Sequence, residues 1–299
     1  MFFKIFKHRS WAFIGFLVVS SFVLTFLVNN HFSGSEASKP EYPKQIVIGF
    51  SNHPSWWPWM VAEEEKLFEA NKLNAKLNWY DNYSDSVRDF QLGLLDANSE
   101  LVIGKKEIQN FAESSKRKVL LNTYSNGDDQ LIVKPGINSL EDLERKTIIA
   151  ESNEILNLFL KNNRLLKQRI NIQFLETGLA SSAFVTDKNI DGVLSYPPYS
   201  DIALRIEGAK AIATSADFPQ EIARMLVLQN NLANQSPEIV EKLKATWFDG
   251  LAFIYENPIK AKTIIAQKLN LDTAQIAQAQ NSTKLIGKNE NSRRLAKQN

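Results

Sequence analysis

Cysteine is absent from the 299-residue chain. This absence excludes a disulfide framework, a thiol nucleophile, a cysteine zinc site and the lipid-modified cysteine of bacterial lipoproteins. It also means that the redox compartment of the protein cannot be read from its composition.

Histidine is nearly as scarce, since the chain holds only His8, His31 and His53, and the first two precede residue 45. One histidine in the remaining chain leaves little room for a histidine metal cluster or a Ser-His-Asp triad. A glycine-rich phosphate loop is missing too, and the run 63–65 of glutamates is typical of a solvated helix face rather than of a spaced acid-base pair. We therefore predict no catalytic residues, no metal site and no cofactor.

A strong charge of either sign is also missing. The chain has 35 Lys and Arg against 33 Asp and Glu, a formal net charge of +2, so nothing indicates a nucleic-acid partner. Its 44% hydrophobic and 23% charged residues are ordinary for a globular protein. A chain of 299 residues suits one large or two compact lobes.

The N-terminal segment predicts export. Lys4, Lys7 and Arg9 precede the uncharged run 11–28, and a basic flank before an apolar run is what the export machinery reads. The run is long enough to span a bilayer, which favours an uncleaved single-pass anchor. Cleavage after Ala37 is the alternative.

We accordingly assign residues 1–37 as a signal peptide or membrane anchor and residues 38–44 as a linker. The whole stretch 29–44 is rich in Ser, Asn, Pro and charge, as flexible tethers are. The remaining chain is then expected in the periplasm or at the extracytoplasmic face of the membrane.

From residue 45 onward, strand-like and helix-like segments alternate. The runs "QIVIGF" (45–50) and "AKLNWY" (75–80) predict strands, and apolar residues at helical spacing lie between them. The alternation continues with helices near 83–95 and 106–115 and strands at 100–104 and 119–124. Such alternation predicts a parallel sheet with helical crossovers.

The same order then begins again. Strands are predicted at 147–151, 170–176 and 192–196, with a helix after the first of them. Asp96 in "LLDA" and Asp191 in "NIDG" stand 95 residues apart by subtraction, and strand 46–50 matches 147–151 at about 100. The chain is therefore predicted to form two similar α/β lobes in tandem.

A strand "RMLVLQ" (224–229) is expected to return the chain to the first lobe, and helices follow it to the C-terminus. Two crossings, near 125–130 and 214–224, would join the lobes as a hinge. A ligand would then lie between the lobes.

Five stretches in the region 45–299 resemble one family. They are "IGFSNHPSWWPWMVAEEEKLF", "YDNYSDSVRDFQLGLLDA", "TYSNGDDQLIVKPGINSLEDLERKTIIAE", "DGVLSYPPYSDIAL" and "SPEIVEKLKATWFDGLAFIYENP". In this order they resemble periplasmic substrate-binding proteins of ABC transporters, the SsuA/TauA and NMT1/THI5-like families, which handle alkanesulfonates, taurine and the thiamine pyrimidine precursor.

The resemblance implies the fold, the partners and the lobe boundaries. It implies a type II periplasmic binding protein, α/β in class, with two lobes joined by a two-crossing hinge and with C-terminal helices. Residues 45–124 and 225–299 would form lobe one, and residues 125–224 lobe two. A small-molecule ligand, an ABC permease and a monomeric state are further implications.

The stretch "SNHPSWWPWM" after the first strand is the first candidate site. The resemblance places this loop in the cleft, so Trp56, Trp57 and Trp59 are predicted to pack on a small organic ligand, with Asn52 adding hydrogen bonds. Alternatively, Trp59 points into the first lobe as part of its core.

The stretch "YSNGDD" at the first crossing is the second candidate site. Gly127 permits a positive φ there. The resemblance implies that Ser125, Asn126 and Asp129 contact the ligand; an ordinary turn is the alternative.

Strand ends supply the other candidates. In "ESNE" (151–154), backbone N–H groups at a helix start attract anions, so Ser152 and Asn153 are predicted contacts, unless Ser152 only caps the helix. Tyr196 and Tyr199 stand on the usual ligand side of an α/β sheet. One further residue, from "YDNYSDS", completes the predicted set: Tyr83.

The chain departs from the family pattern in two places. Many resembling proteins have Trp-Glu-Pro where this chain has Tyr196-Pro197-Pro198, and Asp where it has Arg224. A lost carboxylate and a gained guanidinium predict a more positive cleft and an anionic ligand held by Arg224. Alternatively, Arg224 faces solvent or pairs with Asp217 or Glu221.

Two functions fit these patterns. The first is an exported solute-binding protein that captures a small organic, anionic ligand between two lobes and delivers it to an ABC permease. The alternative is a membrane-anchored sensory or signalling ectodomain with the same fold.

Overall fold

The computed structural model describes residues 45–108, 118–160 and 168–296. Within these residues no helix is both long enough and apolar enough to cross a bilayer. The predicted signal peptide or anchor (1–37) and the linker (38–44) lie outside the described residues, as does most of the predicted helix 106–115.

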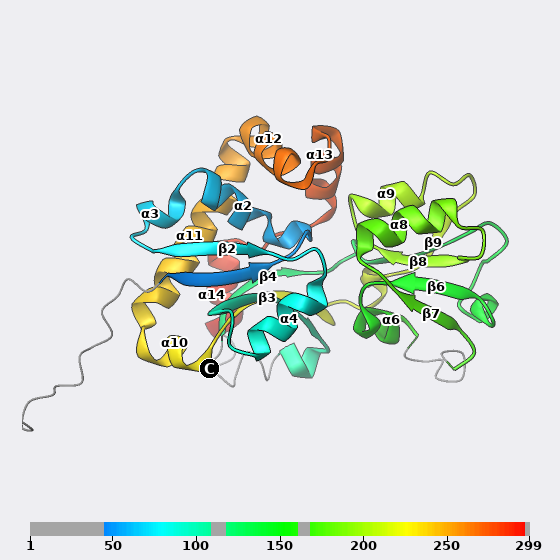
Figure 1. The fold of residues 1–299 in the computed structure, drawn as a ribbon, viewed down its shortest axis with the longest axis horizontal. Helices are drawn as coiled ribbons and strands as arrows, with labels where there is room; N and C mark the ends of the chain where they lie inside the picture. Colours follow the sequence, from blue (N-terminus) through cyan, green and yellow to red (C-terminus); the bar gives the residue numbers. More distant parts are fainter. Residues whose placement is uncertain (1–44, 109–117, 161–167, 297–299) are drawn as a thin grey trace, which may run out of the picture. The chain divides into compact units, whose positions relative to one another are not determined.

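The first of two sheets has five strands in the order β2-β1-β3-β10-β4 (Figure 1). These strands are β1 (Ile46–Phe50), β2 (Ala75–Trp79), β3 (Ala97–Ile103), β4 (Lys118–Tyr124) and β10 (Ile222–Leu228). β1 pairs in parallel with β2 and β3, whereas β10 runs antiparallel to β3 and β4. A strand from far along the chain therefore completes this sheet.

The second sheet has five strands in the order β7-β6-β8-β5-β9. These strands are β5 (Gln130–Val133), β6 (Thr147–Ala150), β7 (Asn171–Phe174), β8 (Gly192–Ser195) and β9 (Lys210–Thr214). Here β5 is the antiparallel strand, paired with β8 and β9, in the place that β10 takes in the first sheet. Each sheet with the helices packed on it forms one lobe, and the two lobes share one topology.

The aspartates that revealed the internal repeat occupy equivalent places. Asp96 Oδ2 accepts a hydrogen bond from Val47 N at 3.0 Å, and Asp191 Oδ2 accepts one from Thr147 N at 2.9 Å. Each carboxylate thus satisfies a backbone donor at the start of the central parallel strand of its own sheet. The pairing explains why an aspartate follows at a similar distance in both lobes.

Two strands were missing from the sequence prediction. β5 follows the first crossing directly, and β9 is the short edge strand "KAIAT". Both lie in the stretches that we had taken only as connections. Their length does not explain the omission, since β6 and β8 are equally short and were predicted.

Two crossings join the lobes, as the predicted fold class requires. Residues 125–129 lead from β4 to β5, and residues 215–221 lead from β9 to β10. The crossings lie side by side, since Gly127 N donates to Ser215 Oγ at 2.7 Å. The lobe boundaries after residues 124 and 224 remain predictions.

Besides a helix that begins at residue 105, nine helical elements of the described residues belong to the first lobe. They are η1 (Pro54–Trp56), α2 (Trp57–Glu64), α3 (Leu67–Ala70), α4 (Tyr83–Gln91), α10 (Asn230–Gln235), α11 (Pro237–Glu256), α12 (Pro258–Leu269), α13 (Thr273–Ser282) and α14 (Lys288–Ala296). α11 buries an apolar face, in which Trp247 is fully buried. Asp272 and Gln275 form a capping box at the start of α13, whereas the side chains of Ser236 and Asn257 accept no capping bond.

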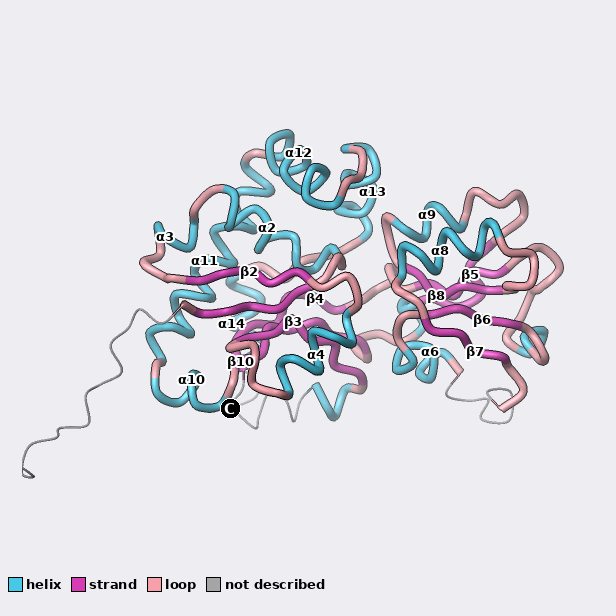
Figure 2. The backbone as a smooth tube through the Cα atoms, in the orientation of Figure 1, coloured by secondary structure: helices cyan, strands magenta, loops and turns pink. Residues whose placement is uncertain are grey.

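Helices cover both faces of the second sheet (Figure 2). They are α6 (Asn153–Phe159) on one face and α8 (Thr177–Thr186) with α9 (Tyr199–Ala203) on the other; two short elements, η2 (Glu141–Leu143) and η3 (Ser215–Asp217), complete the lobe. Leu131 and Val133 of β5 join the core cluster that contains α6, whereas Ile132 joins the one that contains α8. This alternation is the period of two that a strand buried on both faces requires.

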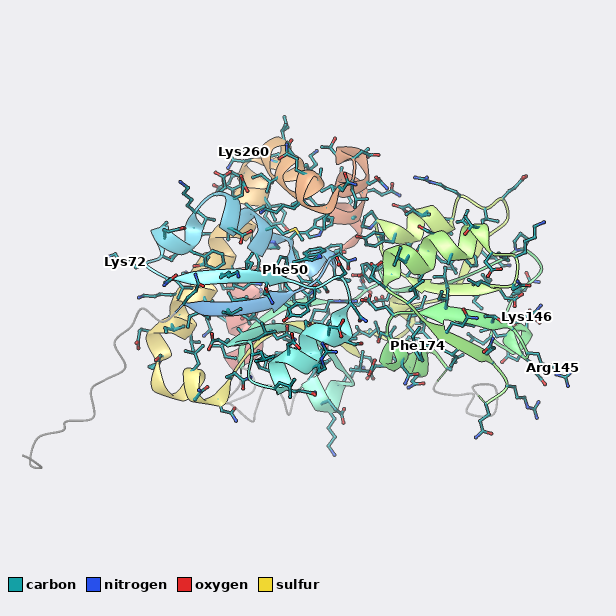
Figure 3. All side chains as sticks on the ribbon, viewed as in Figure 1. Phe50, Lys72, Arg145, Lys146, Phe174 and Lys260 are labelled. Atoms are coloured by element: carbon teal, nitrogen blue, oxygen red, sulfur yellow. The ribbon has the colours of Figure 1, made fainter. Side chains whose placement is uncertain are left out.

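The carboxyl ends of the second lobe's parallel strands face the first lobe. Figure 3 shows Phe174, at the end of β7, on the side of the second lobe that borders the first, while Arg145 and Lys146, which precede β6, lie at the opposite end. Ligands of open α/β sheets bind at carboxyl ends of strands. The fold therefore directs attention to the space between the lobes.

Candidate ligand-binding cleft

An inner cavity of about 40 Å³ lies where the two lobes meet. The first lobe and the crossings contribute Ser51, His53, Trp56, Tyr83, Leu101, Asp129 and Arg224, and the second lobe contributes Glu151, Ser152, Ile155, Thr177, Leu194 and Tyr196. The space holds a group of a few atoms but no whole organic molecule. Both lobes are therefore needed to build its wall.

Arg224 on β10 is the cation of this cavity. Its guanidinium is 4% exposed, and its Nη2 donates to Asp129 Oδ1 at 2.8 Å. Burial opposes the charged form, but the nearby carboxylates of Asp129 and Asp128 outweigh it and raise the pKa of Arg224. Its Nη1 has no hydrogen-bond partner among the described residues.

His53 offers a second free donor. Its Nδ1 accepts a hydrogen bond from Ser55 N at 3.1 Å, so the neutral ring carries its hydrogen on Nε2. No described residue accepts from Nε2. Burial, and then the charge of Arg224, hold the pKa of His53 well below its usual value, so the ring stays neutral near neutral pH.

Tyr83 supplies a third donor. Its hydroxyl accepts from Leu101 N at 2.7 Å, and this leaves the hydroxyl hydrogen to donate elsewhere. Burial, with the charge of Glu100 as the next cause, raises the pKa of Tyr83 and keeps the hydroxyl protonated. Arg224, His53 and Tyr83 thus present N–H and O–H groups to one small space.

A buried network behind Arg224 connects the crossings. Ser125 Oγ lies 2.5 Å from Asp128 Oδ1, 2.5 Å from Asp129 Oδ2 and 2.7 Å from Ser215 Oγ. A hydroxyl donates one hydrogen, so it cannot satisfy both carboxylates at once. Burial, and then the charge of Asp129, raise the pKa of Asp128, which favours a shared proton within this pair.

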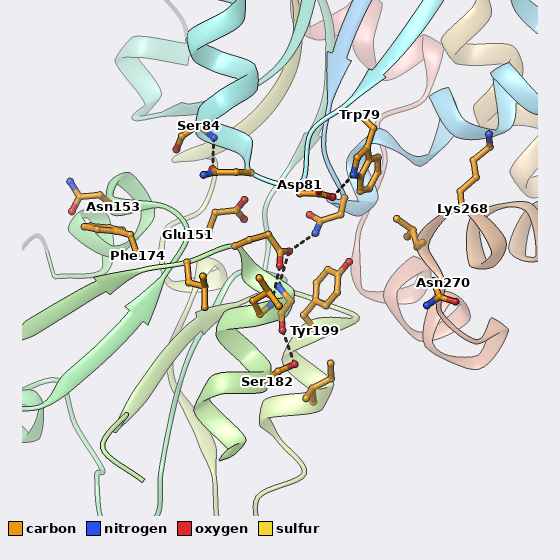
Figure 4. A pocket seen from close by; sticks show the side chains of 18 of the residues that line it. Trp79, Asp81, Ser84, Glu151, Asn153, Phe174, Ser182, Tyr199, Lys268 and Asn270 are labelled. Carbon is orange, nitrogen blue, oxygen red and sulfur yellow. Dashed lines mark hydrogen bonds between the residues drawn. The ribbon is translucent and has the colours of Figure 1, made fainter. Parts of the chain in front are cut away.

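An outer groove of about 1100 Å³ continues from the inner cavity, and Glu151 lines both (Figure 4). The residues that line the groove are mainly apolar, aromatic or acidic. Apolar and aromatic lining residues are Trp79, Phe174, Leu175, Leu179, Tyr199, Ile202 and Leu269, and charged ones are Asp81, Glu151, Glu154, Glu176 and Lys268. Its size is that of a small-molecule site.

Several contacts hold the lobes together across the cleft. Asn52 Nδ2 donates to Glu176 Oε1 at 2.7 Å, and Tyr196 Oη donates to Asn52 Oδ1 at 2.5 Å. The rings of His53 and Tyr196 lie 4.4 Å apart. Near the edge of the groove, Gln278 Nε2 on α13 donates to Asp201 Oδ1 at 3.0 Å. The two lobes are therefore in direct contact, and the cleft is closed at these points.

Burial also changes the titration of the cleft's second-lobe wall. It raises the pKa of Glu151, although Thr177 Oγ1 at 2.5 Å and Tyr83 N at 3.3 Å donate to its carboxylate. It raises the pKa of both Tyr196 and Tyr199 as well. These tyrosines therefore remain neutral hydrogen-bonding groups.

Most of the residues predicted from the sequence lie on the two cavities. Those on the inner cavity are Trp56, Tyr83, Asp129, Ser152, Tyr196 and Arg224, and those on the outer groove are Asn52, Asn153 and Tyr199. Ser152 also caps α6, since its Oγ accepts from Ile155 N at 3.2 Å. Their contact with ligand remains a proposal.

Four predicted residues lie away from these cavities. Trp57 and Trp59 are 1% and 0% exposed and pack in the first lobe's core, where Trp59 stacks on Phe68 at 5.9 Å. Ser125 is buried in the network of the crossings, and Asn126 is exposed. The helix that begins at Trp57 turns these indoles inward, which the spacing of three tryptophans alone could not reveal.

The family's glutamate is replaced by Pro197, but Glu151 and Glu176 bring other carboxylates to the outer groove. Arg224 neither faces solvent nor pairs with Asp217 or Glu221; its partner is Asp129. Glu176 was not predicted, although its place directly before a helix was a signal: it caps α8 by accepting from Gly178 N and Leu179 N. His53 was also missed, because we had weighed it only as a metal ligand or base.

Acid is expected to destabilise the protein through His53. The folded state resists protonating the buried ring, whereas the unfolded chain takes up the proton below about pH 6.5. This contribution is therefore lost as pH falls below about 6.5, by about 1.4 kcal/mol per pH unit until the folded pKa is reached.

The test measures the free energy of unfolding in urea between pH 7.5 and pH 5, for the full-length chain and for its His53→Gln variant. The wild-type free energy of unfolding should approach that of the variant as the pH falls. Parallel curves would contradict the assignment of His53 as the buried neutral group; Asp128 and Glu151, whose raised pKa values act in the opposite direction, are common to both chains.

Comparison with known proteins shows what the chain resembles. The chain is 24% identical over 223 residues to a Brucella abortus protein named as a candidate binding protein, covering 72% of this chain and 68% of that protein. The periplasmic aliphatic sulphonate binding protein of Escherichia coli superposes with a TM-score of 0.63 at 18% identity, over 82% of this chain and 86% of that chain.

The periplasmic nitrate-binding protein of Synechocystis PCC 6803 superposes with a TM-score of 0.59 at 10% identity, over 82% of this chain and 74% of that chain. No model of a known protein family matches the sequence. With its two sheets of matching strand order and its paired crossings, this chain has the type II fold of the periplasmic binding proteins.

Proposed function

We propose that the protein is an extracytoplasmic solute-binding protein that holds a small organic anion between its lobes and passes it to an ABC permease. The observation that carries the proposal is the inner cavity, whose wall needs both lobes and presents three unused donors: Arg224 Nη1, His53 Nε2 and the Tyr83 hydroxyl. A ligand that touches both lobes only when they meet favours the closed state.

The donors suit a carboxylate, sulfonate or similar group. A guanidinium already fixed by Asp129 is pre-organised, and its free Nη1 can form a charge-assisted bond without a rotamer search. The inner cavity is too small for more than such a group, so the body of the ligand would extend into the outer groove. Trp79 and Phe174 there offer apolar surface.

The outer groove limits the total charge of the ligand. Four carboxylates line it, those of Asp81, Glu151, Glu154 and Glu176, and its one lining lysine, Lys268, already pairs with Glu63. A second negative charge would therefore be repelled. We propose monoanions over dianions.

The test is a thermal-shift screen of the full-length chain with small sulfonates and carboxylates, their dianionic analogues and matched neutral amides. A monoanion at about a hundred times its dissociation constant should stabilise the folded form by about 2.7 kcal/mol. In Arg224→Lys, which keeps the charge but loses the free Nη1, the dissociation constant should rise by about tenfold or more.

Arg88→Lys is the matched control, because the Arg88 side chain is 62% exposed and lines neither cavity of the cleft. Its ionic contacts are with Asp85 and Asp89. A shift that Arg224→Lys leaves unchanged would remove Arg224 from the site. If no solute of any of these classes shifts the melting temperature, solute binding itself is refuted.

Delivery to a permease rests on the resemblance described above and on the fold. The sensory alternative uses the same cleft, so ligand binding alone does not separate the two. Uptake of the labelled ligand by cells, with and without the gene for this chain, separates them: a transport protein is required for uptake, and a sensor is not.

A further inference from the structure

A separate cavity of about 300 Å³ lies within the first lobe and shares no lining residue with the two cavities of the cleft. We call it the first-lobe cavity. Its lining residues are Pro54, Trp57, Ile254, Tyr255, Pro258, Lys262, Ala277, Gln280, Asn281, Thr283 and Leu285. They come from η1, the start of α2, the end of α11, the start of α12, the end of α13 and the residues that follow α13. Contacts join α2 to α11 and α12, and α12 to α13, and Figure 1 shows these helices in one part of the first lobe.

The walls of the first-lobe cavity are aromatic and apolar. Trp57, which the cleft does not use, is 1% exposed, and Ile254 is 6% exposed. Tyr255, by contrast, keeps 67% of its surface exposed, so a large aromatic ring stands at the open side of the cavity. Trp57 is therefore almost fully covered by its neighbours, and Tyr255 is the aromatic lining residue that keeps an exposed ring for a ligand.

The first-lobe cavity has a positive charge and no negative one among its lining residues. Lys262 is its only charged lining residue, and it forms no ion pair with another described residue. On the same helix, Lys260 pairs with Glu65 at 2.7 Å and Lys268 pairs with Glu63 at 3.0 Å. Side-chain amides of Gln280 and Asn281 add neutral donors beside the lysine.

We propose that the first-lobe cavity is a second ligand site, for a small aromatic carboxylate. The ring would pack on Tyr255, and the carboxylate would meet Lys262. A volume of about 300 Å³ is at the small end of ligand pockets and suits one ring with a short acid chain. The site is independent of the solute-binding cleft, whose ligand it need not share.

The test titrates phenylacetate into the full-length chain by calorimetry, with phenethylamine as the cationic analogue. Phenylacetate should bind and phenethylamine should not. Lys262→Gln should raise the dissociation constant by about tenfold, because a charge-assisted contact is lost. Ala277→Phe, which fills the cavity, should abolish binding.

Two matched variants separate this site from its surroundings. Lys260→Gln removes a lysine of the same helix that pairs outside the cavity, and Ser182→Phe fills the outer groove instead. Both should bind phenylacetate as the unaltered chain does. A crystal soaked in phenylacetate should show it beside Tyr255 and Lys262.

The proposal is overturned if phenylacetate does not bind, if Ala277→Phe binds it normally, or if Ser182→Phe abolishes binding. Equal affinity for phenethylamine would also refute the role of Lys262. Should Ala277→Phe fail to fold, Lys262→Glu decides instead, since charge reversal on a partly exposed helix position leaves the core intact and should eliminate binding.

Discussion

Replacing Arg224 with methionine is expected to lower the free energy of unfolding by about 3–5 kcal/mol, because it leaves a buried carboxylate without its cation. Asp129 is 1% exposed, and its Oδ1 accepts from Arg224 Nη2 at 2.8 Å. Asp128, equally buried, would lose the same positive charge. Urea unfolding at pH 7 measures the loss.

A double variant tests whether the cause is the unpaired charge. Asp129→Asn combined with Arg224→Met should be less destabilised than the sum of the two single variants, with a coupling of about 0.5–3 kcal/mol. Arg88→Met, at an exposed pair, should change the stability by less than about 1 kcal/mol. Strict additivity would contradict the buried ion pair.

The loss in Arg224→Met should also shrink in acid. The pKa of Asp128 is already raised in the folded state, so the folded protein takes up this proton at a higher pH than the unfolded chain does. Its unfavourable charge is therefore present at neutral pH and relieved as the pH falls towards the unfolded value of about 3.9. Without the Arg224 guanidinium, the charge of Asp128 is more unfavourable, so its protonation in acid recovers more stability.

Truncation of Trp59 to alanine is expected to cost about 3–5 kcal/mol of folding free energy, because the indole is fully buried. It stacks on Phe68 and belongs to the core cluster of the first lobe. Ligand affinity in Trp59→Phe should remain unchanged, since Trp59 lines neither cavity of the cleft. Chemical unfolding and the ligand screen measure the two effects separately.

Trp79 provides the matched control for Trp59. It is 39% exposed, lines the outer groove and donates to Asp81 Oδ1 at 2.7 Å. Trp79→Ala should therefore lower the free energy of unfolding by only about 1 kcal/mol and should instead lower the affinity for the ligand. A large loss of stability in Trp79→Ala, together with a loss of ligand affinity in Trp59→Phe, would contradict these assignments.

Asp129 belongs both to the buried network of the crossings and to the wall of the inner cavity. Asp129 pairs with Arg224 on one side and approaches Ser125 on the other, and Ser125 contacts Ser215 of the second crossing. A ligand group on Arg224 Nη1 would thus act on a residue already connected to both crossings. Two-state elements of this kind allow small contacts to bias domain closure.

The sequence by itself determined the alternation of strands and helices, the repeat of Asp96 and Asp191, and the aromatic and polar loops after the strands. These are local properties, because periodicity and capping depend on neighbouring residues. It therefore predicted the fold class, and most of the site residues that it predicted lie on the two cavities of the cleft. It missed β5 and β9, which pair with each other, β5 also pairing with β8.

Only the tertiary structure decided which side chains face the cleft and which charges they meet. Trp56 reaches the inner cavity while Trp59, three positions later, is in the core, because a helix turns successive side chains to different faces. Arg224 and Asp129 stand 95 residues apart and meet at 2.8 Å, because β10 returns beside β4 at the first crossing. The charge of a cleft is set by pairs that close over such distances, and no local pattern in the sequence records them.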